Sequence, residues 1–396
     1  MPEGAGAGGG PAPADGAGET SLRELALLFL KLGATAFGGP AAHVAMMEEE
    51  VVRRRRWMTP ERFLDLLGAA NLIPGPNSTE LAIHVGFERR RWTGLVVAGL
   101  SFLLPAVLIT GLVARAYVAY GKLPAAGWLL YGVKPAILGI VVQAIASLAP
   151  KAAPGLKLRL LGAASVLLAA LGANELVVLF GAGAVALVLA GRPARKGGAA
   201  LLALGPVLPS VALPLLPAAA GPTALSLFLV FAKIGSVLFG SGYVLLAFLR
   251  ADLVARLGWL TEAQLVDAVA AGQVTPCPVF STATFVGYVL LGPAGAAAAT
   301  AGIFLPAFVF VELSGPLVPR LRRSPRAAAF LSGVNVASLA LMVVVTAILA
   351  RSSLVDVPSL ALFLASAAIL VRFRPNATWV VLGGATAGWL LHALAR

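Results

Sequence analysis

Charged residues are scarce in this sequence of 396 residues. Only 12% are Asp, Glu, Lys or Arg and 59% are hydrophobic, whereas soluble domains carry about 25% charged residues. Apolar runs at 92–112, 128–148, 327–350 and 377–394 have the length of about 17–25 residues that crosses a bilayer. The composition excludes an ordinary soluble domain and predicts an all-α polytopic membrane protein.

Other absences narrow the function. The single cysteine, Cys277, excludes an intrachain disulfide and a cysteine-based metal site, and the three histidines share no metal-ligand spacing, so no metal or cofactor is expected. No phosphate-binding G-x-x-x-x-G-K-[ST] loop occurs. No cluster of acids, histidines or metal ligands predicts an enzyme. The net charge of +13 is assigned to arginine-rich loops rather than to nucleic-acid binding, because no basic patch is interleaved with aromatic residues.

The chain repeats itself. When the sequence is shifted by 202 residues, "FLKLGATAFGG" from Phe29 meets "FAKIGSVLFGS" from Phe231, and "RRRWMTPERFLD" meets "RLGWLTEAQLVD". We therefore divide the chain into a disordered tail at 1–20, a first repeat at 21–196 and a second repeat at 223–396. An apolar, proline-rich linker at 197–222 joins them and is expected to cross the membrane.

Each repeat begins with two helical segments that are interrupted by glycine and proline. The interruptions lie at Gly38–Pro40 and Pro74–Pro76, and at Gly240–Gly242 and Pro276–Pro278. The arms on either side have about 12–17 residues, too short for a hydrocarbon core of about 30 Å. Irregular backbone at this depth is tolerated where protein buries it or where it lines a cavity. We predict two re-entrant helical hairpins in each repeat, followed by about four transmembrane helices.

Loop charges predict that the repeats are inverted. In the first repeat, arginines follow both hairpins at Arg53–Arg56 and Arg89–Arg91, and the loop at 116–123 is nearly neutral. In the second repeat, the loop at 291–294 is uncharged, and the loop at 320–326 carries the arginines. Because basic loops stay on the cytoplasmic side, the two repeats are expected to face opposite sides of the membrane.

Both helices that start after the proline breaks begin with hydroxyl and amide side chains. These are Asn77, Ser78 and Thr79 in the first repeat and Ser281, Thr282 and Thr284 in the second. Such helix starts offer unpaired N–H groups and a positive dipole end, which bind anions. Inverted-repeat transporters bind substrate at such mid-membrane breaks. The backbone N–H groups of Asn77–Thr79 are therefore expected to bind an anion.

Lysines and glycines complete the predicted substrate site. Each first hairpin carries a lysine, Lys31 or Lys233, and a lysine at depth is costly and usually functional. The tip glycines counted with the site are Gly38, Gly39, Gly75 and Gly240. Two alternatives stay open: Lys31 reaches the interface from a tilted helix, and the hydroxyls bond the carbonyl four residues back.

Glu80 is the candidate proton-coupling residue. A carboxylate beside a bound dianion is repelled, so anion binding would favour proton binding there. The alternative is that Glu80 is favoured by the dipole of its own helix N-terminus. Cys277 lies at the second tip, where a thiol could meet an oxidising substrate, although a lone buried cysteine more often acts as a small hydrophobe.

These motifs resemble the chromate transporter superfamily in its long-chain, two-domain form. The resemblance rests on "FLKLGATAFGGP", "PGP" before a polar helix start, the W-x-T-x-x-x-[FL]-x-D pattern in both repeats, and "TPCPVFSTATFVGY". It covers nearly the whole chain after the tail. Two departures lie in the predicted site: "PGPNSTELA" stands where members typically read P-G-P-E-A-Q-Q-L-A, and "PCP" stands for "PGP".

The resemblance implies a secondary transporter that exports chromate across the bacterial inner membrane and confers chromate resistance. Carried onto this chain, its motif positions include Lys31, Phe37, Pro74, Pro76 and Thr282. The alternative is a transporter or channel-like pathway for another oxyanion such as sulfate. The expected partners are the oxyanion and the lipid bilayer, with no nucleic acid, and the sequence is compatible with a homodimer.

Overall fold

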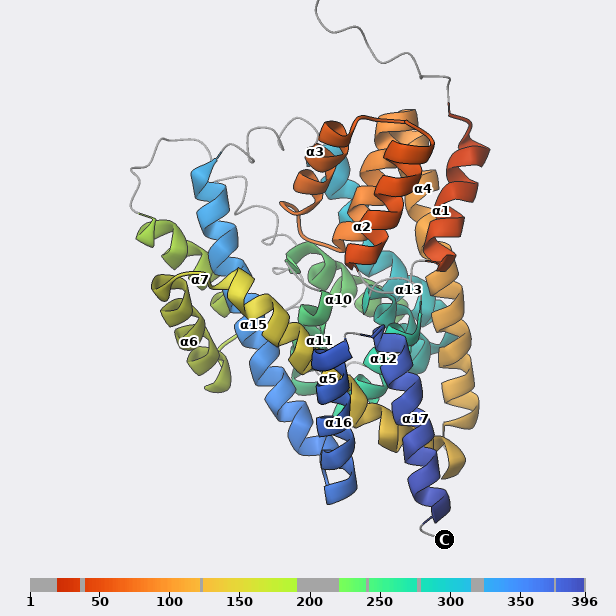
Figure 1. Cartoon of the computed structure of the whole chain (residues 1–396), viewed down its shortest axis with the longest axis vertical. Helices are drawn as coiled ribbons and strands as arrows, with labels where there is room; N and C mark the ends of the chain where they lie inside the picture. Colours follow the sequence, from red (N-terminus) through yellow and green to blue (C-terminus); the bar gives the residue numbers. More distant parts are fainter. Residues whose placement is uncertain are drawn as a thin grey trace, which may run out of the picture.

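The computed structural model describes residues 20–35, 40–121, 124–190, 221–239, 242–275, 279–314, 324–373 and 375–394. These residues are almost entirely helical and include no β-strand, which confirms the all-α prediction. Figure 1 shows the helices gathered into one elongated body. The expected tips at 36–39, 240–241 and 276–278 and most of the linker lie outside the described residues.

The first repeat contains four short helical arms, the last of which opens α4, and then further helices. The arms and helices are α1 (Leu22–Thr35), α2 (Pro40–Glu48) with the π-helical η1 (Glu49–Arg54), α3 (Pro60–Ala70), α4 (Asn77–Tyr120), α5 (Pro124–Ala152), α6 (Leu156–Ala170) and α7 (Glu175–Leu189). At about 1.5 Å per residue, α1 spans roughly 21 Å and α3 roughly 16 Å, so neither crosses a hydrocarbon core of about 30 Å.

The second repeat has the same elements in the same order. They are α10 (Ala224–Val237), η3 (Gly242–Val244), α11 (Leu245–Leu249), η4 (Arg250–Arg256), α12 (Glu262–Val274), η5 (Val279–Ser281), α13 (Thr282–Ser314), α15 (Pro325–Ser353), α16 (Val357–Phe373) and α17 (Ala377–Leu394). The bounds of α10 follow those of α1 by 202 residues, and the bounds of α15 follow those of α5 by 201. The sequence repeat is therefore also a structural repeat.

The long helices α4 and α13 are each a helical hairpin, because the chain reverses direction within them. The backbone leaves helical geometry at Arg90 and Arg91 in α4 and at Leu291 and Gly292 in α13. A Cβ placed on Gly86 would touch the carbonyl oxygen of Gly94, although eight residues of straight helix would separate them by about 12 Å. The chain thus reverses at Arg90–Arg91. We call residues 77–89 the short arm of α4 and residues 92–120 its long arm.

The same close approach recurs in the second repeat, between Gly287 and Gly295. Residues 282–290 are therefore the short arm of α13 and residues 293–314 its long arm. Four helices follow the short arm in each repeat: a long arm and then α5, α6 and α7, or α15, α16 and α17. That each of them crosses the membrane stays a prediction, since α6 and α7 have 15 residues each.

Repeated threonines fix where the arms begin. The Thr59 hydroxyl caps α3 by accepting a hydrogen bond from the Arg62 N–H (3.2 Å), and Pro60 occupies the first helical turn. Thr261 caps α12 in the same way through the Gln264 N–H (3.2 Å). An N-cap hydroxyl satisfies one of the unpaired N–H groups of the first turn. The threonine in the repeated W-x-T pattern thus caps the helix that follows it.

The outer helices are exchanged between the repeats. Helices α6 and α7 pack on α15 of the second repeat, and α16 and α17 pack on α5 of the first. The backbones approach closely at matching positions: Gly333 of α15 meets Ala182 of α7, and Gly132 of α5 meets Gly384 of α17. The long arms of α4 and α13 also pack against each other at the centre of the molecule.

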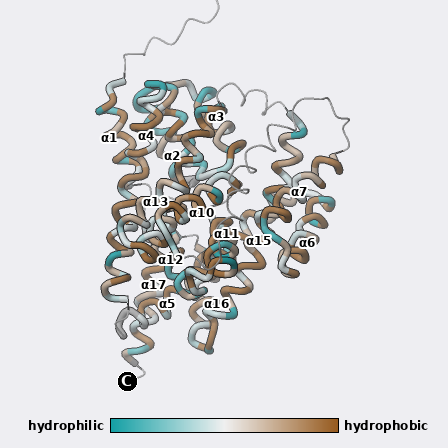
Figure 2. Tube along the Cα trace, turned by 180° about the vertical axis from the view of Figure 1, so that it is seen from behind, coloured by the Kyte–Doolittle hydropathy of each residue, from teal (hydrophilic) through white to brown (hydrophobic). Residues whose placement is uncertain are grey.

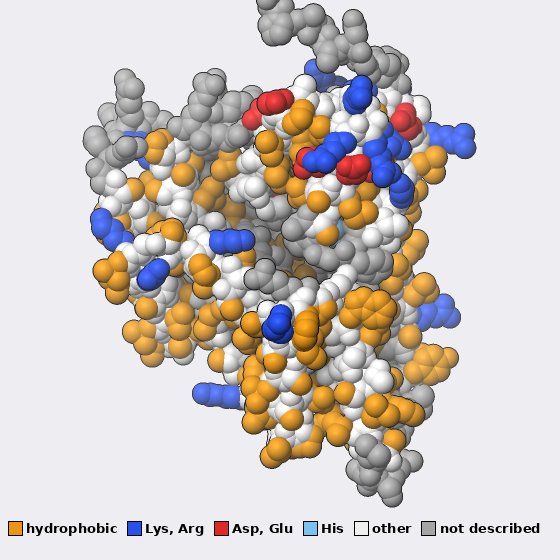
Figure 3. Space-filling model, viewed as in Figure 1, with side chains coloured by type: hydrophobic (Ala, Val, Ile, Leu, Met, Phe, Trp, Pro, Cys, Tyr) orange, Lys and Arg blue, Asp and Glu red, His pale blue; other side chains and the backbone are white. Residues whose placement is uncertain are grey.

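Outward-facing side chains are suited to lipid. Large apolar residues are exposed on the outer helices, among them Leu156, Leu160, Val188 and Val357. Within the described residues, four helical segments are long and apolar enough to cross a membrane, at 77–120, 127–152, 279–313 and 325–353. The first and third contain the reversals, so their long arms are the candidate spans. Figure 2 shows hydrophobic colouring along most of the trace. In Figure 3 acidic and basic side chains gather at the upper end, over α1–α4.

Gly235 is expected to be intolerant of a side chain. A Cβ there would collide with the carbonyl of Ile303, as a Cβ on Gly33 would with that of Phe102. Overpacking of this kind costs about 1–3 kcal/mol, so Gly235→Ala should lower the unfolding temperature of the detergent-solubilised protein. Gly111→Ala is the matched control, because nothing lies within 4 Å of its Cβ. Equal unfolding temperatures for the two variants would contradict the close packing.

Candidate functional site

The first proline break joins the two repeats. Gly75 has φ +139°, a conformation that favours glycine. Its N–H donates a hydrogen bond to the carbonyl of Leu238 (2.9 Å), at the end of α10. The break of one repeat is thus held against the first hairpin of the other.

The hydroxyls that follow the break are buried. The side chains of Ser78 and Thr79 are at most 1% exposed, and their oxygens have no hydrogen-bond partner. Buried polar groups are nearly always hydrogen-bonded in proteins. Two adjacent unpartnered hydroxyls at a helix start are therefore available to a ligand.

Glu80 lies directly over the break. It is fully buried, neither carboxylate oxygen has a hydrogen-bond partner, and a Cβ on Gly75 would collide with Oε1. Across from it lies Ala307 of α13, whose Cβ would be 3.6 Å from such a Cβ. The small residue at position 75 thus makes room for the carboxyl group between the two repeats.

The backbone donors differ in part from the expectation. The N–H of Thr79 donates to the carbonyl of Pro76 (2.8 Å), as does that of Glu80 (3.0 Å). The helix therefore tightens in its first turn, and the predicted availability of the Thr79 N–H is wrong. Asn77 uses its side-chain amide to donate to Asn71.

The second break is more fully satisfied. The hydroxyl of Ser281 lies 3.1 Å from that of Thr275, and the hydroxyl of Thr284 lies 2.8 Å from that of Thr300. Thr282 is fully buried and its hydroxyl has no partner; it faces Gly272, where a Cβ would touch it. Among the three predicted residues of this break, Thr282 matches the unpartnered hydroxyls of the first.

Each predicted lysine has an acidic partner on the other arm of its own hairpin. Lys31 donates to Glu50 (2.8 Å), and its side chain is 56% exposed. The Lys31 hydrogen bond and the nearby positive charges hold the pKa of Glu50 below its usual value, against the opposing effect of desolvation. Arg55 also binds Glu50 (2.6 Å). Direct contact between Lys31 and an anion stays a prediction.

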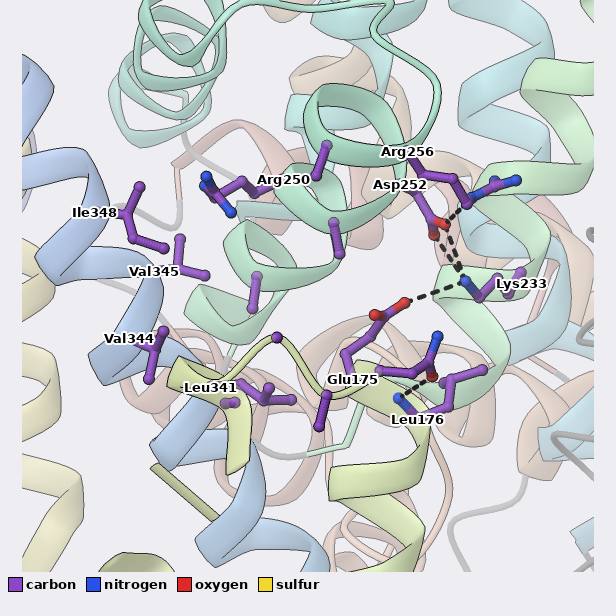
Figure 4. A pocket seen from close by; sticks show the side chains of 17 residues that line it. Glu175, Leu176, Lys233, Arg250, Asp252, Arg256, Leu341, Val344, Val345 and Ile348 are labelled. Atoms are coloured by element: carbon purple, nitrogen blue, oxygen red, sulfur yellow. Dashed lines mark hydrogen bonds and ion pairs between the residues drawn. The ribbon is translucent and has the colours of Figure 1, made fainter. Parts of the chain in front are cut away.

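Lys233 is held more tightly. Its side chain is 6% exposed, and it contacts Asp252 (2.9 Å) and Glu175 (3.4 Å), as Figure 4 shows. Arg256 contacts the same Asp252 (3.1 Å). Lys233 therefore meets carboxylates from its own repeat and from the first residue of α7 in the first repeat.

A cavity of about 550 Å³ lies beside this ion-pair cluster. Its walls come from the α6–α7 turn, α10, α11, η4 and α15, and Lys233, Arg250 and Arg256 line it (Figure 4). Arg250 is paired with Glu262 (2.7 Å). Since each of these basic side chains has an acidic partner, the charges beside the cavity are compensated, and much of its remaining wall is apolar.

The structure brings part of the predicted set together. Gly75, Ser78, Thr79 and the proton-coupling candidate Glu80 form one buried group at the first break. Gly38, Gly39 and Gly240, together with Cys277, lie outside the described residues. In the part of the chain that the structure describes, no group of three His, Cys, Asp or Glu could hold a metal ion.

The sequence reasoning missed four acidic or titratable residues: Glu50, Asp252, Glu175 and His84. Glu50 and Asp252 lie 19 residues after Lys31 and Lys233, so the 202-residue shift could have revealed both pairs. The exchange of Glu for Asp hides the match. Glu175 has no such signal, because its contact with Lys233 depends on the exchange of helices between the repeats.

The fold and the first break define a helical membrane protein built from two repeats, in which the break of the first repeat is hydrogen-bonded to the end of α10 in the second. The sequence matches the family model described as chromate transporter over residues 23–188 and 225–389. The chain belongs to the chromate transporter family.

Three relatives are similar over nearly their whole length. A chromate transport protein of Cupriavidus metallidurans is 33% identical over 383 residues, which cover 94% of each chain. A chromate transport protein of Pseudomonas aeruginosa is 34% identical over 391 residues, 94% of this chain and 92% of the relative. An uncharacterised transporter of Methanocaldococcus jannaschii is 27% identical and covers 94% of each chain. No solved structure matches this chain.

The Lys233 ion pairs should contribute more to the stability of the protein than the Lys31 ion pair. Removing one partner of a buried pair costs about 3–5 kcal/mol, whereas exposed pairs contribute about 1 kcal/mol or less. Lys233→Met should therefore lower the unfolding temperature in detergent far more than Lys31→Met. Lys233→Arg, which keeps the charge beside the cavity, should be close to the parent protein. Similar losses in both Met variants would show that burial does not distinguish the pairs.

Proposed function

We propose that this protein is a secondary transporter that exports chromate, a tetrahedral oxyanion, across the bacterial inner membrane. Membership of the family and the names of the two relatives at 33% and 34% identity support chromate as the substrate. The observation that carries the binding site is the pair of buried, unpartnered hydroxyls at Ser78 and Thr79. Hydroxyl and N–H donors suit an anion that offers oxygen acceptors on all sides.

We propose further that the two repeats are inverted and that their short arms form re-entrant hairpins. The arms are too short to cross the hydrocarbon core, and the arginine-rich ends alternate between the repeats. In Figures 1 and 2 the hairpins of the first repeat lie at the upper end, and α10–α12 lie lower. The hydrogen bond from Gly75 to Leu238 supports a meeting of the tips at mid-depth.

In this proposal the anion lies between the two helix starts. Ser78 and Thr79 donate from one repeat and Thr282 from the other, where the dipoles of both short arms add positive potential. Neutral donors allow the anion both to bind and to leave, because its release does not require the separation of an ion pair with a fixed positive side chain. Lys31 and Lys233 are paired with Glu50 and Asp252, and they contribute positive charge to the anion pathway from the outer parts of the hairpins.

The second candidate is transport of another oxyanion such as sulfate. Hydroxyls and helix dipoles recognise charge and oxygen acceptors, which chromate and sulfate share, and the departure at Asn77–Glu80 from the usual family residues favours keeping this candidate. A channel-like pathway is the further alternative. It requires flux that does not saturate and does not respond to an opposing gradient of a second ion.

The experiment that tests the function uses the purified protein in lipid vesicles. Labelled chromate and labelled sulfate are measured separately, with and without a pH gradient. A secondary transporter should show saturable chromate flux that responds to the gradient. Saturable sulfate flux with no chromate flux would change the substrate, and flux that is linear with concentration would favour the channel.

Ser78→Ala and Thr79→Val should weaken anion binding without destabilising the protein. Hydrogen bonds to charged groups contribute about 1.5–3 kcal/mol, so each variant should lose about ten-fold or more in chromate affinity. Because neither hydroxyl has a protein partner, the unfolding temperature should not fall. Ser165→Ala is the control, since the Ser165 hydroxyl bonds the Leu161 carbonyl (2.8 Å) away from the break. Unchanged chromate affinity in both variants would move the site elsewhere.

Glu80→Gln should keep anion binding and flatten its pH dependence. The ionised carboxylate repels the dianion, so the parent protein should bind more weakly as pH rises, and Gln imitates the protonated form. The measurement is chromate affinity of both proteins between about pH 5 and 8. Chromate itself takes up a proton in this range, so the ratio of the two affinities at each pH is compared. A constant ratio would leave Glu80 as a residue favoured by the helix dipole.

A further inference from the structure

Three titratable side chains follow each other at intervals of one helical turn along the short arm of α4. They are Glu80, His84 and Glu88, which we call the titratable column. Residues four apart lie on the same face of a helix, about 5–6 Å between Cβ atoms. Glu80 is fully buried, His84 is 6% exposed, and the Glu88 side chain is 35% exposed. The column therefore leads from the proline break to the surface.

The two buried members of the column lack protein partners. Both carboxylate oxygens of Glu80 and Nε2 of His84 are buried with no hydrogen-bond partner. At the outer end, Glu88 accepts two hydrogen bonds from Arg62 of α3, from Nε (3.0 Å) and Nη2 (2.8 Å). The outer end is thus fixed in place, and the inner groups keep atoms that can accept or release a proton.

The helices packed against α4 also carry charged and titratable residues. Among the described residues these are Arg23, Glu24 and Lys31 on α1, His43 and Glu48 on α2, Glu61, Arg62 and Asp65 on α3, Glu262 and Asp267 on α12, and Glu312 on α13. Lys31 binds Glu50, Asp267 binds Tyr117 of the long arm, and His43 packs against Phe102. Arg62 and Glu88 bond each other at the outer end of the column, and among the described residues the carboxylate oxygens of Glu80 have no hydrogen-bond partner.

The second repeat has no such column. A shift of 202 residues places Thr282, Val286 and Leu290 at the three positions, and none of them titrates. The column was therefore not imposed by the shared repeat architecture. It belongs to the hairpin whose outer ends carry Arg53–Arg56 and Arg89–Arg91, the face that the distribution of arginines assigns to the cytoplasm.

We propose that the titratable column carries protons between the anion site at the proline break and the arginine-rich face of the protein. The proposal rests on the proposed transport function and names the proton as the coupled ion. As the O–H bond of Glu80 breaks, His84 accepts the proton on Nε2 through one bridging water molecule, because the two groups are not hydrogen-bonded to each other in this conformation. The imidazolium then releases the proton toward Glu88 and bulk water and returns to its neutral form. His84 thus sets the rate of proton exchange, and Glu80 sets its coupling to the anion.

The test measures proton and anion movement together. The full chain is reconstituted into vesicles that contain a trapped pH indicator, and an outward chromate gradient is applied. The parent protein should move protons with chromate. His84→Gln should slow proton movement at least ten-fold while exchange of labelled for unlabelled chromate continues. Its equilibrium pH dependence of chromate binding should match that of the parent, because Glu80 is intact.

Two further variants make the result specific. His392→Gln is the matched control, because His392 stacks on Trp128 between α17 and α5 and has no place in the column. It should move protons and chromate as the parent does. His84→Ala should be slow like His84→Gln, and added imidazole should restore its proton movement. Rescue by imidazole supports a proton-carrying role, because a purely structural histidine would not be replaced by a free ring.

The outcomes separate the column from the transport function. Proton movement by His84→Gln at the parent rate would overturn the column, as would chromate movement by the parent protein without protons; the proposed function would stand in both cases. A parent protein that moves no oxyanion would overturn both. His84→Gln with slow protons, continued chromate exchange and rescue of His84→Ala by imidazole would support the column.

Discussion

The hydrogen bond from Gly75 to the Leu238 carbonyl joins the two repeats where both interrupt their helices. In a chain with few charges, every polar group at membrane depth needs a partner from the protein, from water or from a ligand. The break satisfies part of this requirement across the repeat boundary. Its remaining unpartnered atoms, on Ser78, Thr79 and Glu80, are gathered at one place. The polarity that the fold leaves unsatisfied is therefore concentrated where a ligand can use it.

The two repeats have the same parts in different environments. Lys31 with Glu50 and Lys233 with Asp252 occupy equivalent positions, yet the first lysine is largely exposed and the second is buried. Glu175 adds a second carboxylate to Lys233. Equivalent hairpins thus pack differently against the surrounding helices, and the chain is not symmetric in this conformation. Such asymmetry is what two repeats need if one opens to water while the other is closed.

The sequence was sufficient for the helical class and for the shift that relates the helices of the two repeats, because these depend on local composition and on a fixed spacing along the chain. The repeat of Thr59 at Thr261 even gives the helix starts. Contacts between segments far apart in the chain could not be predicted from the sequence. Glu175 reaches Lys233 only because α7 packs beside α15 of the other repeat. The burial of His84 has no signature in a single sequence, and neither has the 3₁₀-like turn that engages the Thr79 N–H.

The exchange of outer helices has a consequence for biosynthesis. Helices α6 and α7 find their packing partner only when α15 has been made, and α15 begins at residue 325. At about 5–20 residues per second, α7 precedes the start of α15 by on the order of ten seconds. During that interval the first repeat must rest in the bilayer with an apolar face that lipid or a chaperone covers. Assembly of the core is therefore a late event, completed when the second repeat has been inserted and packs against the outer helices of the first.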